Sequence, residues 1–367
     1  MSASFFYLQT DFPVYGVEFT HQNKLVAAGG GGYGHSGVPN KIAVYKIKPS
    51  EKECEKTHEH SYQGDAPNSL ATHPDVPQFI TGINESEKQV VNGDNENCKL
   101  FAIGETEITL GTKCKTVESN KIEHYQRVAR FSGDGKKIAT GTSEGKEGKL
   151  IVLNYPTLER AFDPVDFVDE DGVIDASFDH TNRLLAATSK KRINILDVNT
   201  GESLQTIQRP VLAKSTLYDF RACRFGRGET EGYLYTVVYN KGHSKSFVCK
   251  WDAQKWDKVK QRTLGPITAF AISYDGKLLG YATADYSIGL LDAQTLRPLV
   301  RVPRAHTYII TSLCFSRDGR LLVSGGADGK CCVVQVPREF PNDKTRVYLI
   351  ILTLLAVLLA LLLQFYQ

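Results

Sequence analysis

A short pattern that recurs along the chain constrains the fold more than any other feature. Each copy reads as a strand end, a turn and a new strand, and four copies are clear: "FSGDGKKIATG" at Phe131, "FDHTNRLLAAT" at Phe178, "ISYDGKLLGYA" at Ile272 and "FSRDGRLLVSG" at Phe315. The first two lie 47 residues apart and the next interval is 94, so a further copy is expected near residue 225, where "FGRGETEGYLYTVV" begins. Two degenerate copies precede them, at residues 19 and 71.

Repeats with a period in the forties are typical of propellers built from WD repeats, in which each unit forms a four-stranded blade. The seven units therefore predict an all-β, seven-bladed WD-repeat-like β-propeller. The signature is degenerate, because residues 304–336 keep the His and Asp positions of the repeat but carry "VVQV" in place of Trp-Asp. A solenoid or a β-sandwich is the alternative fold.

The last blade lacks one strand in the sequence. Only ten residues, 337–346, separate its third strand, expected at 331–336, from an apolar segment. The N-terminal "SASFFYLQ", residues 2–9, alternates well enough to pair there. We expect this strand to close the last blade, which removes two exposed sheet edges.

The C-terminal end reads as a membrane anchor. It contains "VYLIILTLLAVLLALLLQFYQ", with no charge in the seventeen residues from Val347 to Leu363. About 20 residues of helix span a bilayer core, so we expect a cytosolic propeller at residues 1–338, a linker at 339–346 and a transmembrane helix at 347–366. A buried core helix is the alternative. Lys344 and Arg346 precede the segment, which by the positive-inside rule keeps the propeller in the cytosol.

Four further features bear on localisation and partners. The eight cysteines show neither a C-x-x-C motif nor zinc-ligand spacing, as expected for reduced thiols in strands. The sequon at Asn84 would carry a glycan only if this region faced the lumen, so we expect it unmodified. A net charge of +3 is too small to indicate nucleic-acid binding. A span of about 17 to 20 residues fits the thin endoplasmic-reticulum bilayer.

A glycine-rich stretch, "AAGGGGYGHSGVPNKI" at residues 27–42, interrupts the first repeat. It approaches the P-loop pattern, but a histidine stands where the phosphate-binding lysine is required, and the chain continues into the strand-like "KIAVYKI" rather than a helix. We expect strands at 14–19, 24–28 and 42–46, with the stretch connecting the second and third. A loop this long in a hairpin is either functional or merely tolerated.

The chain resembles a known family, the endoplasmic-reticulum membrane guanine nucleotide exchange factors for the Sar-family GTPase of the COPII coat, which includes the prolactin regulatory element-binding protein of animals. The resemblance rests on "FPVYGVEF", the glycine-rich stretch, "YDFRACRFG" from Tyr218 to Gly226, the seven degenerate repeats and the C-terminal apolar segment. It extends over the whole chain.

The resemblance implies that the glycine loop binds a potassium ion and presents an asparagine to the GTPase. On this sequence the asparagine is Asn40, which we expect to be exposed, with Pro39 stiffening the chain before it and His35 inside the loop. Glycines let successive carbonyls turn toward one centre. The candidate carbonyls for the ion are those of Gly30, Gly31, Gly32 and Val38.

The resulting functional prediction is a nucleotide exchange factor that activates a Sar-family small GTPase at the endoplasmic-reticulum membrane and so starts COPII vesicle assembly. The protein would not be an enzyme with covalent chemistry of its own, because no Ser-His-Asp, paired-carboxylate or metal-hydrolase constellation stands at a recognisable spacing. The alternative is a membrane-tethered propeller scaffold without exchange activity, and a hydrolytic propeller enzyme is a third hypothesis.

Overall fold

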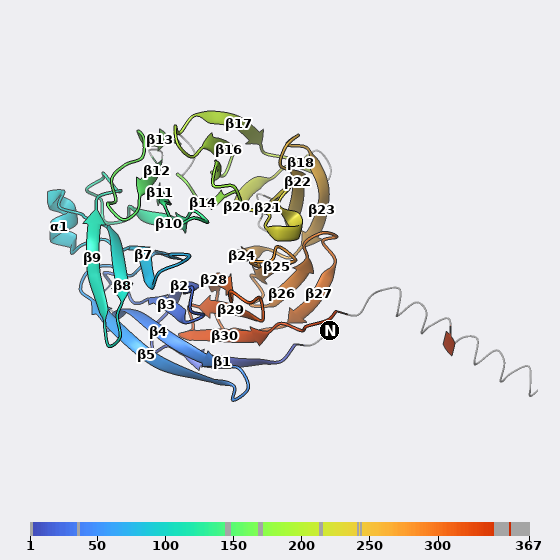
Figure 1. Cartoon of the computed structure of the whole chain (residues 1–367), viewed down its shortest axis with the longest axis horizontal. Helices are drawn as coiled ribbons and strands as arrows, with labels where there is room; N and C mark the ends of the chain where they lie inside the picture. The colour runs from blue at the N-terminus through green and yellow to red at the C-terminus, as the bar shows by residue number, and fades with distance from the viewer. Residues whose placement is uncertain are drawn as a thin grey trace, which may run out of the picture. The chain divides into compact units, whose positions relative to one another are not determined.

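The computed structural model describes residues 3–34, 37–143, 148–167, 172–212, 216–240, 242, 244–340 and 352–353. Met1–Val336 forms one compact unit. Within it, seven four-stranded antiparallel sheets stand around a centre like the blades of a propeller (Figure 1). The predicted seven-bladed, all-β propeller is confirmed.

Each blade runs from an inner strand to an outer one. From the inner strand outward, the first three blades are β2 (Val14–Phe19), β3 (Leu25–Gly29), β4 (Asn40–Lys48), β5 (Glu53–Tyr62); β6 (Ser69–Thr72), β7 (Gln78–Gly82), β8 (Cys98–Ile103), β9 (Ile108–Cys114); and β10 (Tyr125–Phe131), β11 (Lys137–Ser143), β12 (Lys149–Asn154), β13 (Val165–Asp166). A short helix, α1 (Glu87–Asn92), joins β7 to β8.

The other four blades follow the same plan. They are β14 (Asp175–Phe178), β15 (Leu184–Thr188), β16 (Arg192–Asp197), β17 (Ser203–Gln208); β20 (Asp219–Phe225), β21 (Tyr233–Tyr239), β22 (Ser246–Asp252), β23 (Lys258–Leu264); β24 (Ile267–Ile272), β25 (Leu278–Thr283), β26 (Ile288–Asp292), β27 (Pro298–Val302); and β28 (Ile310–Phe315), β29 (Leu321–Gly326), β30 (Lys330–Gln335), β1 (Phe5–Gln9). The pair β18 (Val211–Leu212) and β19 (Thr216–Leu217) and a 3-10 turn, η2 (Gly228–Thr230), complete the elements.

The predicted N-terminal closure of the last blade is confirmed. β1 pairs antiparallel with β30, from Phe5 opposite Val334 to Gln9 opposite Lys330. Phe6 and Leu8 point into the core while Phe5 is exposed, which is the alternation expected of an outer strand with one buried face.

The repeat pattern locates the blades because it marks the end of each inner strand. Six of the seven predicted starting residues, all but Ala71, are the last residues of inner strands, and Ala71 lies one residue before the end of β6. The second strands are buried on both faces, as in β3 and β25, whereas the outermost β9 and β23 are mostly exposed. The hydrophobic cores lie between neighbouring blades, where apolar faces of adjacent sheets pack together.

The strand directions define two ends of the propeller. The loop between the second and third strands of a blade, such as residues 30–39 in blade one, lies at one end, which we call the loop face. The turn that follows each inner strand lies at the opposite end, the turn face. β30, a third strand, ends at Gln335 on the turn face, where its side-chain amide donates to the carbonyl of Pro49, just beyond β4, at 2.7 Å.

The predicted transmembrane helix, 347–366, lies outside the described residues except for Leu352 and Thr353. Within the described part of the chain, no helix combines the length and the apolarity needed to cross a bilayer. All eight cysteines are free thiols.

Candidate functional site

The candidate site is the glycine loop, residues 30–39, which joins β3 to β4 as predicted. Its first residue, Gly30, has a φ of 145° and donates its N–H to the carbonyl of Pro13 at 3.0 Å. A Cβ at this position would lie 2.4 Å from Oδ1 of Asn40 and 2.5 Å from its Cα. Only glycine therefore lets the loop begin against Asn40.

Asn40 connects the two ends of the loop to Gly64, in the segment that joins blade one to blade two. Its Oδ1 accepts from the N–H of Gly32 at 2.9 Å, and its Nδ2 donates to the carbonyl of Gly64 at 2.7 Å and more weakly to that of Gly32 at 3.4 Å. The residue is only 7% exposed. The expectation of an exposed side chain is therefore wrong, because Gly64, 24 residues along the chain, supplies a partner that turns the amide inward.

Tyr33 anchors the middle of the loop to blade two. Its hydroxyl donates to the backbone carbonyl of Glu85 at 2.6 Å. Burial raises the pKa of the Tyr33 phenol, and the nearby carboxylate of Asp65 raises it further. The phenol therefore stays protonated and remains a hydrogen-bond donor at physiological pH.

Asp65 places a carboxylate beside the loop. Its Oδ1 accepts from the N–H of Ala66 at 2.8 Å and its Oδ2 from Nδ2 of Asn68 at 3.3 Å, and a Cβ on Gly32 would lie 3.2 Å from Oδ1. Burial raises the pKa of Asp65 although these hydrogen bonds lower it. No basic side chain of the described residues forms an ion pair with Asp65, so its negative charge is available to a cation.

A buried ion pair supports the segment that anchors Tyr33. Nζ of Lys99, whose side chain is fully buried, donates to Oε1 of Glu85 at 2.6 Å and to the carbonyl of Glu96 at 2.6 Å. The hydroxyl of Tyr62 donates to the other carboxylate oxygen of Glu85 at 3.3 Å. Burial lowers the pKa of Lys99, an effect that its carboxylate partner opposes.

Asn84, next to this pair, is a structural residue. It is 1% exposed, its Nδ2 donates to the carbonyl of His124 at 2.9 Å and its Oδ1 accepts from Nδ2 of Asn95 at 3.1 Å. The expectation that this sequon carries no glycan stays a prediction, because a glycan is added to the chain before it folds.

The structure places the other predicted site residues as follows. Gly31 and Val38 are half-buried, with Val38 packed against the core cluster that includes Phe12 and Val14, and Pro39 is exposed. His35 lies outside the described residues. Of the predicted set, hydrogen bonds or close packing bring together Gly30, Gly32 and Asn40.

Sequence reasoning missed Tyr33, Gly64, Asp65, Glu85 and Lys99. All but Tyr33 lie outside the loop, and Tyr33 acts through a contact 52 residues away. No local pattern marks them. The one available signal was the "GD" pair at residues 64–65, a turn-forming dipeptide directly after the fourth strand of the same blade.

The potential metal ligands beside the loop are oxygen atoms. Among the described residues, no cluster of three or more His, Cys, Asp or Glu side chains could hold a metal ion. The donors near the loop are instead backbone carbonyls, such as that of Gly32, and the carboxylate of Asp65. Such oxygen sets are typical of cations that bind without thiolate or imidazole ligands.

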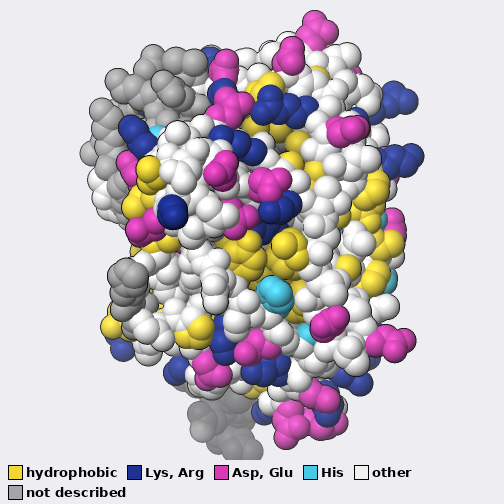
Figure 2. Space-filling model, turned by 90° about the vertical axis from the view of Figure 1, so that its left-hand side faces the viewer, with side chains coloured by type: hydrophobic (Ala, Val, Ile, Leu, Met, Phe, Trp, Pro, Cys, Tyr) yellow, Lys and Arg dark blue, Asp and Glu magenta, His cyan; other side chains and the backbone are white. Residues whose placement is uncertain are grey.

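Figure 2 views the left-hand side of Figure 1, where β5, β8 and β9 lie, and shows lysine and arginine side chains intermingled with acidic ones. Ion pairs that involve these strands join Glu59 of β5 to Lys41 of β4 at 2.8 Å and Lys113 of β9 to Glu96, just before β8, at 2.5 Å. This face therefore has no continuous region of one charge sign.

Comparison with known proteins finds relatives that match most of the chain. Residues 297–334 match the WD domain, G-beta repeat (WD40). The guanine nucleotide-exchange factor SEC12 of Candida glabrata is 25% identical over 352 residues, which cover 91% of this chain and 72% of the relative. The chain is similar to SEC12 guanine nucleotide-exchange factors over most of its length. The resemblance found in the sequence is thus confirmed.

Two further relatives match the chain over similar lengths. SEC12-like protein 2 of Arabidopsis thaliana is 24% identical over 316 residues, covering 83% of this chain and 74% of the relative. The guanine nucleotide-exchange factor SEC12 of Rattus norvegicus is 22% identical over 344 residues, covering 83% and 81%. The similarity extends well beyond a single repeat.

Proposed function

We propose that this protein is a guanine nucleotide exchange factor for the Sar-family small GTPase that starts COPII coat assembly at the endoplasmic reticulum. The observation that carries the proposal is the similarity to proteins named guanine nucleotide-exchange factors over 91% of the chain. The glycine loop is the element proposed to act on the GTPase, because it is long and glycine-rich, Tyr33 ties it to blade two, and Asn40 ties it to the segment between blades one and two.

Exchange requires a large free-energy difference that one side chain cannot supply. A GTPase that holds its nucleotide with a picomolar to nanomolar Kd gains about 12 to 16 kcal/mol, while a neutral hydrogen bond contributes about 1 kcal/mol net. The propeller must therefore bind the nucleotide-free GTPase more tightly than the loaded one over a whole interface. Cytosolic GTP then refills the emptied site.

Within this mechanism Asn40 is a positioning residue. Its amide holds Gly32 and Gly64 at fixed places, so the loop meets the GTPase already ordered and loses less conformational entropy on binding. Pro39 is exposed directly before Asn40 and is the loop residue that we propose contacts the GTPase. His35, inside the loop, is a second proposed contact.

The proposed cofactor is a potassium ion held by the loop, with the carbonyls of Gly30, Gly31, Gly32 and Val38 as candidate donors. The carboxylate of Asp65 is a further candidate, since it lies beside Gly32 without an ion-pair partner among the described residues. When bound, such an ion would neutralise Asp65 and draw the carbonyl groups inward. Asn40 and Tyr33 would hold the loop backbone in place around it.

Potassium is expected to raise the melting temperature of the protein relative to lithium at equal ionic strength, because a ligand that binds the folded state stabilises it. Exchange activity should fall in lithium as well. Asp65→Asn should abolish the difference in melting temperature between the two salts. Equal melting curves of the wild type in potassium and lithium would contradict an ion site in the loop.

The proposed anchor is residues 347–366, joined by residues 339–346 to a cytosolic propeller at 1–338. The chain leaves the propeller on the turn face, beyond Gln335, whereas the glycine loop lies at the loop face. We propose that the loop is thereby directed to a GTPase approaching from the cytosol. The ten residues from 337 to 346 reach at most about 33 to 36 Å.

The function is tested by nucleotide release from a purified Sar-type GTPase loaded with a fluorescent GDP analogue. The full chain in detergent should accelerate release from this GTPase and not from a Ras-type GTPase used as the control. Binding of the Sar-type GTPase without any acceleration would favour the membrane-tethered scaffold instead.

A further inference from the structure

The centre of the propeller contains a cavity of about 630 Å³, lined by residues of the inner strands of all seven blades and the turns that follow them. Six arginines and four acidic residues line it. Nothing in the proposed exchange mechanism uses these charged groups.

The charged residues at one end of this cavity occupy equivalent positions in different repeats. The next-to-last residues of the seven inner strands form one layer: Glu18, Ala71, Arg130, Ser177, Arg224, Ala271 and Cys314. The residues two positions beyond the strand ends form the next layer, and six of them line the cavity: Pro74, Gly133, His180, Arg227, Tyr274 and Arg317. Four arginines are therefore concentrated at the turn face.

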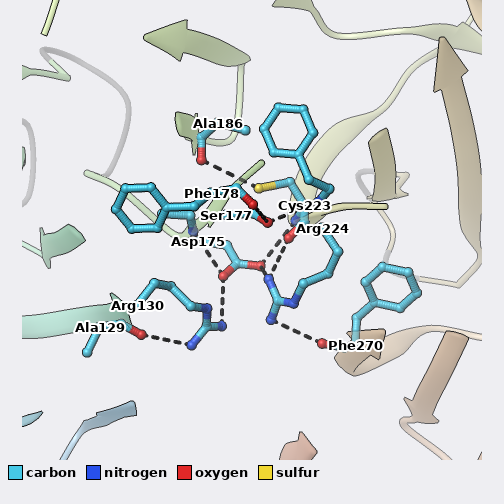
Figure 3. A network of polar contacts seen from close by, with 11 residues as sticks. Ala129, Arg130, Asp175, Ser177, Phe178, Ala186, Cys223, Arg224 and Phe270 are labelled. Atoms are coloured by element: carbon cyan, nitrogen blue, oxygen red, sulfur yellow. Dashed lines mark hydrogen bonds and ion pairs between the residues drawn. The ribbon is translucent and has the colours of Figure 1, made fainter. Parts of the chain in front are cut away.

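Asp175 neutralises only part of this charge. Its carboxylate is shared between two guanidinium groups, with Arg130 at 3.0 Å from Oδ1 and Arg224 against Oδ2 (Figure 3). It also accepts from the N–H groups of Ala176 and Cys223, so its hydrogen-bonding capacity is filled. Burial and the neighbouring Arg224 lower the pKa of Arg130, as expected where positive charge is in excess.

Arg227 and Arg317 flank the ring of Tyr274, with guanidinium carbons 5.1 and 4.4 Å from its centroid. Neither forms an ion pair with a carboxylate of the described residues. The Nε of Arg317 is buried without a hydrogen-bond partner there, and one of its terminal nitrogens makes only a long contact, 3.5 Å, to the carbonyl of His73. Buried guanidinium donors of this kind are normally satisfied.

The acidic residues at this end leave the two arginines unpaired. Asp179 is occupied by its own turn, where it accepts from the backbone N–H groups of Arg183 and Leu184. Glu18 makes no ion pair with a described residue; burial raises its pKa, although the four arginines lower it. Glu231 contacts His180 at 3.5 Å.

We propose that the turn-face end of the central cavity is a binding site for a compact polyanion that carries several phosphate groups, held by Arg227 and Arg317. Guanidinium groups recognise phosphate through paired, charge-assisted hydrogen bonds. The cavity lies within the size range of small-molecule sites. The site is distinct from the glycine loop, which lies at the opposite end of the propeller.

Two kinds of molecule could present several phosphate groups to this site. β30 ends on the turn face, so the arginine-lined mouth opens on the side from which the chain continues toward its C-terminal apolar segment. A phosphorylated inositol lipid head group could reach the mouth from a membrane. A soluble inositol polyphosphate presents the same phosphate groups from the cytosol, and the experiment must separate the two.

The test is calorimetric titration of the full chain in detergent with inositol hexakisphosphate as the probe. The wild type should bind one equivalent, and Arg227→Gln and Arg317→Gln should each weaken binding about tenfold. Glu18→Gln should strengthen binding, because it removes a carboxylate that faces the anion. Arg317→Lys should retain part of the affinity through its charge.

Arg221→Gln is the matched control. Arg221 lines the same cavity and belongs to the same strand, β20, as Arg224, but it lies toward the loop face. Among the described residues its guanidinium donates to the carbonyl of Thr268 at 3.3 Å. Its loss should change the affinity less than twofold. Melting curves check that each variant is folded before its affinity is compared.

The lipid source is tested by reconstituting the chain into phosphatidylcholine vesicles with or without phosphatidylinositol bisphosphate. Weaker apparent binding of the probe in the presence of this lipid supports the site with a lipid head group as its ligand, while unchanged binding supports the site with a soluble ligand. No binding by the folded wild type, or an equal loss in Arg221→Gln, would overturn the proposal. None of these outcomes depends on exchange activity.

Discussion

Asn40→Ala is expected to lower the free energy of unfolding by about 2 to 3 kcal/mol and to remove most of the exchange activity. The substitution deletes the amide that bonds Gly32 and Gly64, and it leaves their backbone groups without these partners in a half-buried place. Each orphaned group costs about 1 to 3 kcal/mol. Urea unfolding and nucleotide release, both at a temperature where the variant is fully folded, measure the two effects.

Pro39→Ala and Asn40→Asp distinguish two roles, direct contact with the GTPase and anchoring of the glycine loop. Pro39 is exposed, so its substitution should change stability by less than about 0.5 kcal/mol. Asn40→Asp keeps the acceptor for Gly32 but sets a carboxylate oxygen against the carbonyl of Gly64, so stability and activity should fall at least as far as in Asn40→Ala. An Asn40→Ala variant with wild-type stability would contradict the anchoring role.

Glu85→Ala should destabilise the protein more than Asn40→Ala. We expect it to lower the free energy of unfolding by about 3 to 5 kcal/mol, because it leaves the fully buried Lys99 ammonium without its carboxylate. The glycine loop should loosen as well, since Tyr33 is bonded to the backbone of the same residue. Chemical denaturation gives the first effect, and hydrogen exchange of the loop amides gives the second.

The Glu85–Lys99 ion pair allows a second prediction, for a variant in which both partners are replaced. Replacing both partners with apolar residues, Glu85→Leu with Lys99→Met, should recover much of the stability lost in the single variants. Lys56→Met is the matched control, because Lys56 forms a contact of 2.5 Å with Glu59 but is 44% exposed, and an exposed pair contributes about 0 to 1 kcal/mol. Equal losses for Lys99→Met and Lys56→Met would contradict the importance of burial.

The blades could be predicted from sequence because each repeat contains the same short pattern of neighbouring residues. The aromatic or apolar residue at the end of each inner strand and the polar turn after it recur at regular spacing, and β2 was predicted with its observed bounds, 14–19. The closure by β1 followed from a missing strand and from the alternation of Phe6 and Leu8 with exposed neighbours. These signals are local in sequence.

Only those features of the site that depend on residues close together in sequence could be predicted. The position of the glycine loop between β3 and β4 follows from the strands that flank it. The burial of Asn40 does not, because it depends on Gly64, and the anchoring of Tyr33 depends on Glu85 in the next blade. Pairing across blades is set by how the sheets pack.

The two arginine-containing layers of the central cavity could have been predicted in part. Arg130 and Arg224 occupy the same position in two repeats, and so do Arg227 and Arg317 in the next layer. A comparison of the seven units column by column would have revealed both layers. Their convergence on one cavity becomes evident only once the ring has closed.

The central claim is exchange, and its most direct test compares the affinity of the full chain for a Sar-type GTPase without nucleotide and with GDP bound. Linkage requires that the chain weaken nucleotide binding by the same factor by which it prefers the empty GTPase. We predict tight binding of the nucleotide-free form, at least roughly a hundredfold weaker binding of the GDP form, and loss of this preference in Asn40→Ala. Equal affinity for both forms would contradict exchange, however tightly the two proteins bind.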